Sequence, residues 1–367
     1  MEGLGVSAAP PSGPRPDPAF WAGRRVFLTG HTGFKGTWAR LWLSRLGAEV
    51  HGYALTPESD PALHHLVGAA GLAGETIADI RDARALAGAL AAAAPDVVLH
   101  MAAQPLVRRS FERPTETFEV NVMGTVHLLD AVRQVPSVAV ALIVTTDKVY
   151  HNDESGRTFR EDDRLGGHDP YSASKAAAEH VVAAYRASLF AGHDARIATA
   201  RGGNVLGGGD FSADRLVPDV VRAALAGRDL AIRNPQATRP WQHVLDCLAG
   251  YFLYVEALAA GRTTVGALNF GPLADEAPMP VGRLASAVQA ALGLAPAWDH
   301  VSAEDQPREM NRLHLDPALA VTTLGWRPRL DAPAIVERTA AWYADWRAGR
   351  PPLAVTRAQI DAFMEGP

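Results

Sequence analysis

A tyrosine and a lysine four residues apart are the first residues of this chain that could do chemistry. Tyr171 and Lys175 follow Asp169-Pro170 and open a segment with helical spacing of apolar residues. This spacing puts both side chains on one helix face. A nearby ammonium lowers the pKa of a tyrosine, so Tyr171 could take a proton from a substrate hydroxyl near neutral pH. We therefore predict a proton-transfer pair.

A hydroxyl, an acid and an amine stand together after an apolar run that ends at Val144. They are Thr146, Asp147 and Lys148, and Thr145 precedes them. Simple hydride transfer needs only a hydroxyl beside a tyrosine and a lysine, so the added acid and amine indicate a second proton-transfer step. An ordinary Asp–Lys surface turn is the other interpretation.

A glycine-rich loop joins the first apolar strand pattern to the first helical pattern. Its glycines lie three apart, and residues without a Cβ allow a tight turn and close approach to a pyrophosphate. The following helix N-terminus offers free N–H groups, and Lys35 would add charge. The position between strand and helix favours a dinucleotide loop over a plain glycine turn. Its predicted cofactor contacts are Gly30, Thr32, Gly33, Phe34, Lys35 and Gly36.

The dinucleotide is predicted to be NAD. No lysine or arginine lies between Arg45 and Arg81, so the 2′-phosphate of NADP would lack a cationic partner. The usual acid after the second strand is not obvious, because Glu58 comes slightly late. Lys175 would also hold the nicotinamide ribose. Further cofactor contacts are expected at the ends of later strands and in one helix: Asp79, Ile80, Ala102, Ala103, Gln104, Asn121 and Thr145.

Strand and helix patterns alternate through the first half of the chain. Strands are predicted at 24–30, 48–55, 75–80, 96–102, 140–147 and 195–203, and helices at 35–46, 82–94, 114–135 and 171–189. This order predicts an α/β fold with a doubly wound parallel Rossmann sheet, whose ligands bind beyond the carboxyl ends of the strands.

The chain is expected to divide into two parts after a mobile leader. The leader is residues 1–20, and the NAD-binding Rossmann domain spans 21–205, with 240–275 returning to it. A smaller, mainly helical substrate-binding lobe is assigned to 206–239 and 276–350.

Composition excludes several classes of protein. The net charge of -5 argues against a nucleic-acid or membrane-surface binder. No apolar run reaches the roughly 18 residues of a membrane span. The single cysteine, Cys247, cannot build a disulfide framework and favours a reducing cytoplasm. The histidines show no metal spacing, so no metal is expected.

Several of these segments together resemble a known enzyme family. From about residue 20 to 345, the stretches GHTGFKGTW, HMAAQPLVRRS, NVMGTVHLL, TTDKVY, DPYSASKAAAE, RGGNVLGGGD and RNPQATRPWQHVLD are similar to CDP-glucose 4,6-dehydratases. The related dTDP-glucose and GDP-mannose enzymes usually carry Asp-Glu where this chain has Asp147-Lys148. The lysine therefore favours a CDP-hexose as substrate.

The resemblance implies a reaction with internal hydride return. Tyr171, assisted by Thr146 and Lys175, would remove the proton of the sugar 4-hydroxyl while NAD takes the C4 hydride. The 4-ketone makes the C5 proton acidic, water leaves from C6, and the hydride returns to C6. Asp147 would be the acid at the 6-hydroxyl, and Lys148 the C5 base when neutral, although the assignment within this pair stays open.

Substrate contacts are expected in the second half of the chain. Arginine offers paired donors to phosphate oxygens, so Arg215, Arg239 and Arg308 are assigned to the diphosphate and ribose. Arg233 and Trp241 are expected to border the cytosine. The predicted residues are Asn204, Arg215, Arg233, Arg239, Trp241 and Arg308. One departure from the family is Arg308-Glu309-Met310, where His-Glu-Ala is usual. His64-His65 receives no role, and His243 is interpreted as structural.

Two other functions remain open at this point. Another nucleotide-sugar 4,6-dehydratase or a 4-epimerase would share the fold, but an epimerase needs no acid–base pair for elimination. A silent NAD-sensing module need not keep Tyr171 and Lys175. The fold family often forms paired-helix dimers, so a homodimer or a dimer of dimers is expected.

Overall fold

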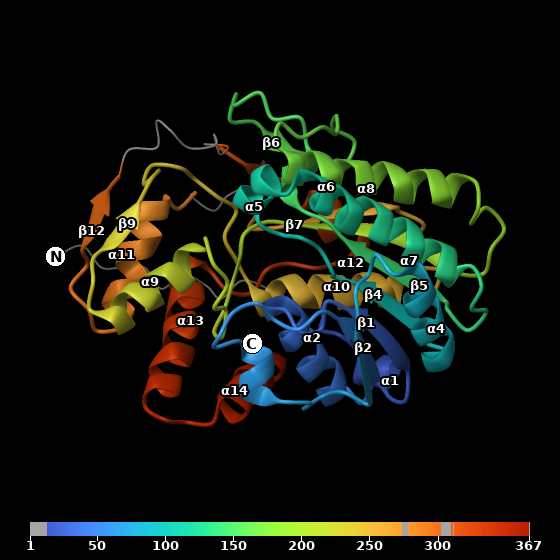
Figure 1. Cartoon of the computed structure of the whole chain (residues 1–367), viewed down its shortest axis with the longest axis horizontal. Coiled ribbons are helices and arrows are strands. Elements are labelled where there is room, and N and C mark those ends of the chain that lie inside the picture. Colours follow the sequence, from blue (N-terminus) through green and yellow to red (C-terminus); the bar gives the residue numbers. More distant parts are fainter. Residues whose placement is uncertain (1–12, 274–277, 302–309, 311, 367) are drawn as a thin grey trace.

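A parallel sheet of seven strands forms the centre of the computed structural model (Figure 1), which describes residues 13–273, 278–301, 310 and 312–366. Its strand order is β11-β7-β5-β4-β1-β2-β3, and every neighbouring pair is parallel. The order reverses between β1 and β4, so the predicted doubly wound sheet is confirmed. The strands are β1 Arg25–Thr29, β2 Glu49–Ala54, β3 Gly74–Ile77, β4 Val97–His100, β5 Val140–Val144, β7 Arg196–Gly202 and β11 Ala267–Phe270.

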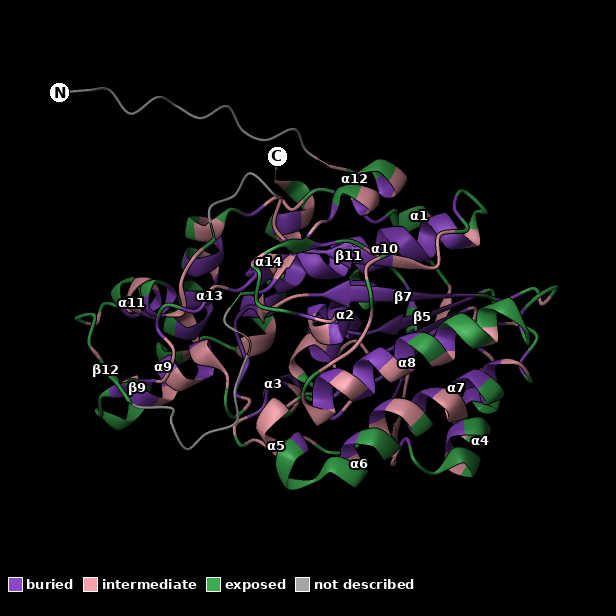
Figure 2. Ribbon diagram, turned by 90° about the horizontal axis from the view of Figure 1, so that it is seen from above, coloured by how far each residue is buried: buried purple, intermediate pink, exposed green. Residues whose placement is uncertain are grey.

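Alternate side chains of the strands pack into two separate cores, one on each face of the sheet. In β1, Val26 and Leu28 belong to one core, whereas Phe27 belongs to the other. Figure 2 shows that α10 is buried along most of its length, whereas α7 and α8 expose one side. Helices therefore cover both faces, as a parallel sheet requires. The helices around the sheet are α2 Phe34–Arg45, α10 Val244–Ala259, α4 Ala83–Ala93, α7 Gly124–Val132 and α8 Pro170–Ala187.

A smaller group of elements packs together at one end of the molecule (Figure 1). Here β9 pairs with β12, and α11 packs against α9 and α13. The bounds are α9 Leu216–Ala226, β9 Leu230–Ile232, α11 Val281–Ala291, β12 Trp298–His300 and α13 Ala332–Arg347. The remaining elements are α3 Leu63–Val67, α5 Val107–Glu112, α6 Pro114–Phe118, β6 Thr158–Phe159, β8 Val205–Leu206, β10 Gln242–His243, β13 His314–Leu315, α12 Ala318–Leu324 and α14 Pro352–Glu365.

The residues just before the first strand are packed where a mobile leader was expected. Pro16 is buried, and Asp17 caps α1 (Pro18–Trp21) by accepting a hydrogen bond from the Ala19 N–H. Trp21 is fully buried, and its indole N–H donates to Glu256 Oε1 at 2.7 Å. The chain is therefore tied to α10 at Asp17 and Trp21, which both donate to the side chain of Glu256.

Two boundaries differ from the prediction near the functional residues. The helix expected over 114–135 is interrupted between α6 and α7 by a π-helical turn, η1 (Glu119–Met123). The strand expected to reach residue 147 ends at Val144, and a short 3-10 helix, η2 (Asp147–Val149), follows. Both changes occur at the carboxyl edge of the sheet, where local irregularity often accompanies function. No helix in the described ranges is long and apolar enough to cross a membrane.

Candidate active site

The predicted proton-transfer pair lies in the first two turns of α8. Asp169 caps this helix by accepting a hydrogen bond from the Ser172 N–H at 2.9 Å. Tyr171 and Lys175 are both buried, with 8% and 6% of their surfaces exposed. Lys175 Nζ donates to the carbonyl of Val144 at 3.1 Å, which places the ammonium against the end of β5. The helix thus brings both groups to the carboxyl edge of the sheet.

Burial shifts the pKa values of these two groups in opposite directions. The pKa of Tyr171 is raised by burial, and a hydrogen bond with the Thr146 side chain opposes that shift. The expected net lowering of the tyrosine pKa is therefore wrong for this structure, because desolvation of the phenolate outweighs the groups that favour it. The pKa of Lys175 is lowered to about 8 by burial and by the Lys35 charge.

Thr146 and Asp147 form a hydrogen-bonded unit beside Tyr171. Thr146 Oγ1 donates to Asp147 Oδ1 at 2.8 Å and accepts from the Lys148 N–H at 3.4 Å. Asp147 is only 2% exposed, and burial raises its pKa against the opposing charge of Lys148. Among the described residues its second oxygen, Oδ2, is buried without a hydrogen-bond partner. A buried carboxyl of this kind is suited to carry a proton.

The glycine loop is shaped so that nothing larger than glycine fits at its critical positions. Gly30 has a φ of +77°, and a Cβ there would lie 2.7 Å from the Ala102 nitrogen. A Cβ on Gly36 would lie 2.1 Å from the Gly30 carbonyl oxygen. Gly33 is the N-cap of α2 and supplies no side-chain cap. The free N–H groups of the first helical turn are thus left for a ligand.

Three other residues of this loop turn into the protein. Thr32 Oγ1 donates to the carbonyl of Leu55 at 2.7 Å, which ties the loop to the end of β2. Lys35 Nζ donates to the hydroxyl of Tyr251 on α10 at 3.5 Å. The Phe34 ring lies against Gly207, where an added Cβ would approach it to 3.0 Å. The charge of Lys35 is therefore placed toward α10 and acts on Lys175.

Asn121 on η1 connects the loop after β4 with α8. Its Oδ1 accepts from the Gln104 N–H at 2.9 Å, and its Nδ2 donates to the Gln104 carbonyl and to Ser174 Oγ. The N–H of Ala102 donates to Thr29 Oγ1 at 3.1 Å, and Ala103 is half-buried. This set holds the end of β4 in place beside the catalytic helix.

The acidic residues near the ends of β2 and β3 already have arginine partners. Asp79 is paired with Arg81 at 2.6 Å, which lowers the pKa of the carboxyl. Glu58 is paired with Arg109 at 2.5 Å. Ile80, which follows Asp79, is buried. If either carboxylate contacts the adenine or the ribose of a cofactor, it must do so while it is still paired with its arginine.

Two of the predicted substrate arginines face the acid at the centre of the site. The positive charges of Arg215 and Arg239 both act on Asp147, opposing the rise in its pKa. Arg215 is the N-cap residue of α9, and its Nη2 donates to the carbonyl of Pro105 at 3.3 Å. Arg239 is buried, with 7% of its surface exposed. These two guanidinium groups are therefore the ones that the fold brings to the active site.

The structure describes three of the four other predicted substrate residues. Asn204 accepts a hydrogen bond from the Gln242 N–H through its backbone carbonyl. The Trp241 indole is buried and donates to the carbonyl of Met279 at 2.8 Å, so it packs inside the lobe. Arg233 is half-buried on the strand end after β9. Arg308 lies outside the described residues.

Sequence reasoning missed a buried polar network directly behind Lys175. Glu179 lies one helical turn after Lys175 and forms a 2.7 Å ion pair with Arg201 of β7, with 3% and 4% of their side-chain surfaces exposed. The spacing of four between Lys175 and Glu179 was a usable signal, because it places both on one face of α8. Arg201 carried no comparable signal, since its partner is supplied by another element.

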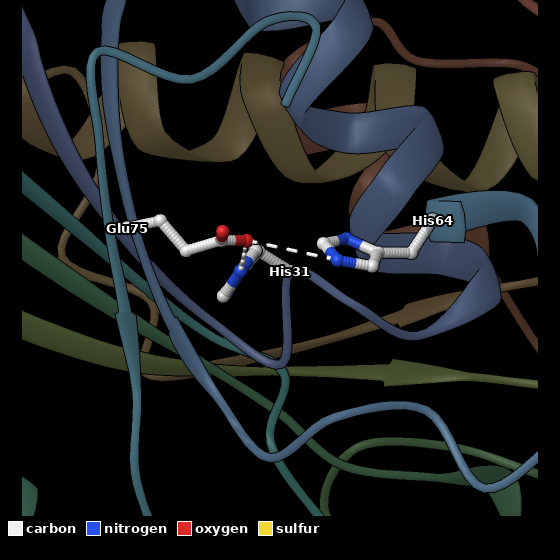
Figure 3. A group of neighbouring side chains, drawn as sticks. All are labelled: His31, His64 and Glu75. Carbon is white, nitrogen blue, oxygen red and sulfur yellow. Dashed lines mark hydrogen bonds and ion pairs between the residues drawn. The ribbon is translucent and has the colours of Figure 1, made fainter. Parts of the chain in front are cut away.

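Three side chains, one of them from the glycine loop, lie close enough to share an ion (Figure 3). His31 Nε2 lies 2.8 Å from Glu75 Oε1, and His64 Nε2 lies 3.7 Å from the same oxygen. Burial lowers the pKa of both imidazoles, that of His64 to about 4. The charge of buried Arg40 also acts on both imidazoles and opposes a cation here. We interpret the cluster as support that ties the glycine loop to β3.

Comparisons with known proteins agree with this geometry. Residues 27–339 match the family model described as GDP-mannose 4,6 dehydratase. The chain is 42% identical over 354 residues to the CDP-glucose 4,6-dehydratase of Salmonella typhimurium, covering 95% of this chain and 98% of that protein. It is 31% identical to the dTDP-glucose 4,6-dehydratase of Streptomyces antibioticus over 75% of this chain and 77% of that one.

A solved structure with the same fold is the UDP-glucose-4-epimerase from Stenotrophomonas maltophila with bound NAD and formylated UDP-arabinopyranose. The TM-score is 0.75 at 25% identity, over 89% of this chain and 99% of that one. The fold and the Tyr171–Lys175 site define an extended short-chain dehydrogenase. Within that class, the chain belongs to the family of nucleotide-sugar 4,6-dehydratases.

Proposed function

We propose that this protein is a lyase that converts CDP-D-glucose to CDP-4-keto-6-deoxy-D-glucose with bound NAD. The reaction removes one water and involves no net oxidation, because the hydride taken from C4 is returned to C6. The observation that carries the proposal is the buried carboxyl of Asp147, hydrogen-bonded to Thr146 beside Tyr171 and with one oxygen unpartnered among the described residues. An oxidation alone would not need this group.

The glycine loop fits a dinucleotide. The close approach at Gly30 and Gly36 and the uncapped N-terminus of α2 provide the backbone surface that a pyrophosphate needs. NAD, when bound, supplies the hydride acceptor and donor for the reaction. Tyr171 and Lys175 would hold the reacting end, while Gln104 and Asn121 fix the neighbouring loop.

The chain's own residues account for each proton transfer. Tyr171 takes the proton of the 4-hydroxyl, and Thr146 hydrogen-bonds to it. Lys175 supplies the positive charge that favours the phenolate form when substrate is present. Asp147 gives a proton to the departing 6-hydroxyl, because its raised pKa keeps it protonated to higher pH than an ordinary carboxyl. Lys148, when neutral, takes the C5 proton, and the ammonium so formed would give a proton back to C5 once the hydride has been returned to C6.

The nucleotide is proposed from charge and from the curated relative. The named activity of the 42% identical protein is that of a CDP-glucose 4,6-dehydratase. The positive charges of Arg215 and Arg239 act on Asp147, and paired guanidinium donors suit the phosphates of a sugar diphosphate. We propose that Arg233 and Trp241 shape the far end of the nucleotide site, and that Asn204 contacts the sugar.

The test is incubation of the NAD-loaded protein with CDP-glucose, dTDP-glucose and GDP-mannose in parallel. We expect water loss from CDP-glucose, detected as a 4-keto-6-deoxy product. Turnover of another nucleotide sugar without turnover of CDP-glucose would overturn the nucleotide assignment. Conversion of CDP-glucose to a C4 epimer without water loss would support the epimerase alternative instead.

We propose that the protein is a homodimer, or a dimer of such dimers, formed through the helices next to α8. Three apolar side chains on α5, α6 and η1 are exposed by 39–45%: Phe111, Phe118 and Met123. These elements pack on α8, so the exposed apolar side chains lie beside the helix through which we propose that two copies pair. Light scattering of wild type and Phe118→Glu would test the assembly.

The free, buried Cys247 suits a reducing cytoplasm, which we propose as the compartment of the protein.

A further inference from the structure

The turn that carries the elimination residues is attached at both ends to one buried ion pair. Thr145, just before the turn, donates from Oγ1 to Glu179 Oε1 at 2.5 Å. Tyr150, just after it, accepts from Arg201 Nη1 at 2.8 Å. Glu179 and Arg201 are themselves paired at 2.7 Å. Residues 146–149 thus form a short loop whose two ends are attached to one charge pair.

The same ion pair belongs to the helix that carries the oxidation residues. Glu179 lies on α8, one turn beyond Lys175 and two turns beyond Tyr171. A displacement of α8 would therefore be transmitted through Glu179 and Arg201 to the turn. A displacement of the turn would likewise reach α8, because Lys175 Nζ donates to the carbonyl of Val144, the last residue of β5 before the turn. The two sets of proton-transfer groups are held in a fixed relation.

The network is buried, and both terminal nitrogens of Arg201 are hydrogen-bonded, although its Nε has no partner among the described residues. Tyr150 is fully buried and also donates from its hydroxyl to Asn269 Oδ1 at 2.7 Å. Its ring stacks on Phe159 with centroids 5.0 Å apart and an interplanar angle of 6°. Buried hydrogen bonds to charged groups are strong and directional, and losing them is costly. The arrangement is thus stiffer than a solvent-exposed turn would be.

We infer that the Glu179–Arg201 pair is a positioning device that sets Asp147 and Lys148 relative to Tyr171 and Lys175. This inference rests on the proposed dehydratase function, and it adds four positioning residues: Thr145, Tyr150, Glu179 and Arg201. Oxidation at C4 and water loss across C5 and C6 occur on one sugar held in one pose. Groups for both steps must therefore be aligned together, and a displacement of about 1 Å can cost about a hundredfold in rate.

Single hydroxyl deletions test this without breaking the ion pair, whose loss would leave a buried charge and endanger folding. Tyr150→Phe keeps the stacked ring and removes the link to Arg201. Thr145→Val removes the link at the other end of the turn. The matched control is Thr199→Val, because Thr199 Oγ1 also donates to Glu179, at 2.8 Å, but Thr199 lies on β7 and is not joined to the turn.

In single turnovers with CDP-glucose we expect both turn variants to slow water loss by at least about tenfold. In Tyr150→Phe, C4 oxidation should keep its rate, so the reduced cofactor accumulates, and Thr199→Val should behave as wild type. The inference would be overturned if Tyr150→Phe slowed both steps in proportion or neither step, or if Thr199→Val slowed water loss as much as Tyr150→Phe.

A second measurement separates this inference from the proposed function. Amide hydrogen exchange of residues 146–150 needs no substrate, and it should quicken in Tyr150→Phe and Thr145→Val but not in Thr199→Val. Faster exchange in the two turn variants, together with a wild type that fails to convert CDP-glucose, would retain the positioning device and reject the proposed substrate. Unchanged exchange in both turn variants would reject the positioning device itself.

Discussion

The hydroxyl of Thr146 donates a 2.8 Å hydrogen bond to one carboxylate oxygen of Asp147, and the same side chain opposes the rise in the pKa of Tyr171. A single threonine therefore joins the group proposed for oxidation to the group proposed for elimination. The other oxygen of Asp147 is buried and, within the described part of the chain, has no partner. The substrate 6-hydroxyl would satisfy it.

Asp147→Asn should separate the two chemical steps. Asparagine keeps the shape and can still accept from Thr146, but it cannot give a proton to a leaving hydroxyl. We expect water loss to fall by about 10²- to 10⁴-fold, the usual contribution of a general acid, while C4 oxidation continues. Rapid-scan absorbance of the bound nicotinamide would show its reduced form persisting. A variant that converts substrate at the wild-type rate would remove Asp147 from the mechanism.

Tyr171→Phe should block the reaction before any hydride moves. The phenol is the proposed base for the 4-hydroxyl, so both oxidation and product formation should fall by about 10²- to 10⁴-fold. Binding of CDP-glucose, measured by calorimetry, should change little because the ring remains. Tyr185→Phe is a suitable control, since the Tyr185 hydroxyl bonds to Asp130 on the outer side of α8. Accumulation of reduced nicotinamide in Tyr171→Phe would contradict this role.

Turnover should decline as the pH rises above about 8. The pKa of Lys175 is lowered from its usual value to about 8, so the ammonium that favours the phenolate is lost over that range. Lys175→Arg keeps its charge at high pH, and its residual activity should lack this alkaline decline. The check is the pH profile of kcat for both proteins. An alkaline limb at the same pH in both would assign it to another group.

The packing of residues 13–21 should make stability depend on pH through Glu256. Burial raises the pKa of Glu256 to about 7, whereas an unfolded chain has the ordinary value near 4.5. Between these pH values the folded protein binds the proton more tightly, so the stability contributed by this group is lost as the pH rises from about 4.5 to 7.

Glu256→Gln tests this linkage, because the amide oxygen can still accept from Trp21 and cannot ionise. At pH 8 we expect the variant to be more stable than wild type by up to about 3 kcal/mol, and at pH 4.5 to show little gain. Urea unfolding at the two pH values provides the comparison. An equal gain in the free energy of unfolding at both pH values would show that ionisation of Glu256 is not the cause.

Arg215→Gln and Arg239→Gln should weaken nucleotide-sugar binding. A lost hydrogen bond to a charged group costs about 1.5–3 kcal/mol, which corresponds to roughly a 10- to 150-fold rise in Kd. Arg228 is exposed on the same lobe, so Arg228→Gln is the matched control. Calorimetric titration with CDP would decide. Equal affinities in all three variants would place the diphosphate elsewhere.

Much of the fold and the residues at strand ends could be predicted from local pattern. The order of apolar strands and amphipathic helices determined the doubly wound sheet, and the sheet then placed Thr146, Gly30 and Tyr171 at one edge. The spacing of a motif predicted which side chains lie close together where both residues are on one element, as with Tyr171 and Lys175 on α8. These are features that neighbours along the chain encode.

The rest depends on contacts between distant segments and on burial, which spacing does not reveal. His31, His64 and Glu75 meet from a loop, a helix and a strand. Arg201 finds Tyr150 and Glu179 only after β7 has joined the sheet. The predicted direction of the Tyr171 pKa shift was wrong for the same reason. Burial of the phenol raises this pKa and outweighs the charges that were predicted to lower it.

The most direct test follows the hydride itself. CDP-glucose labelled with deuterium at C4 should give a product that is lighter by one water and carries the deuterium at C6, as seen by mass spectrometry and NMR. Deuterium found at C4 of an epimer, or lost to solvent, would contradict the internal transfer on which the proposed function depends.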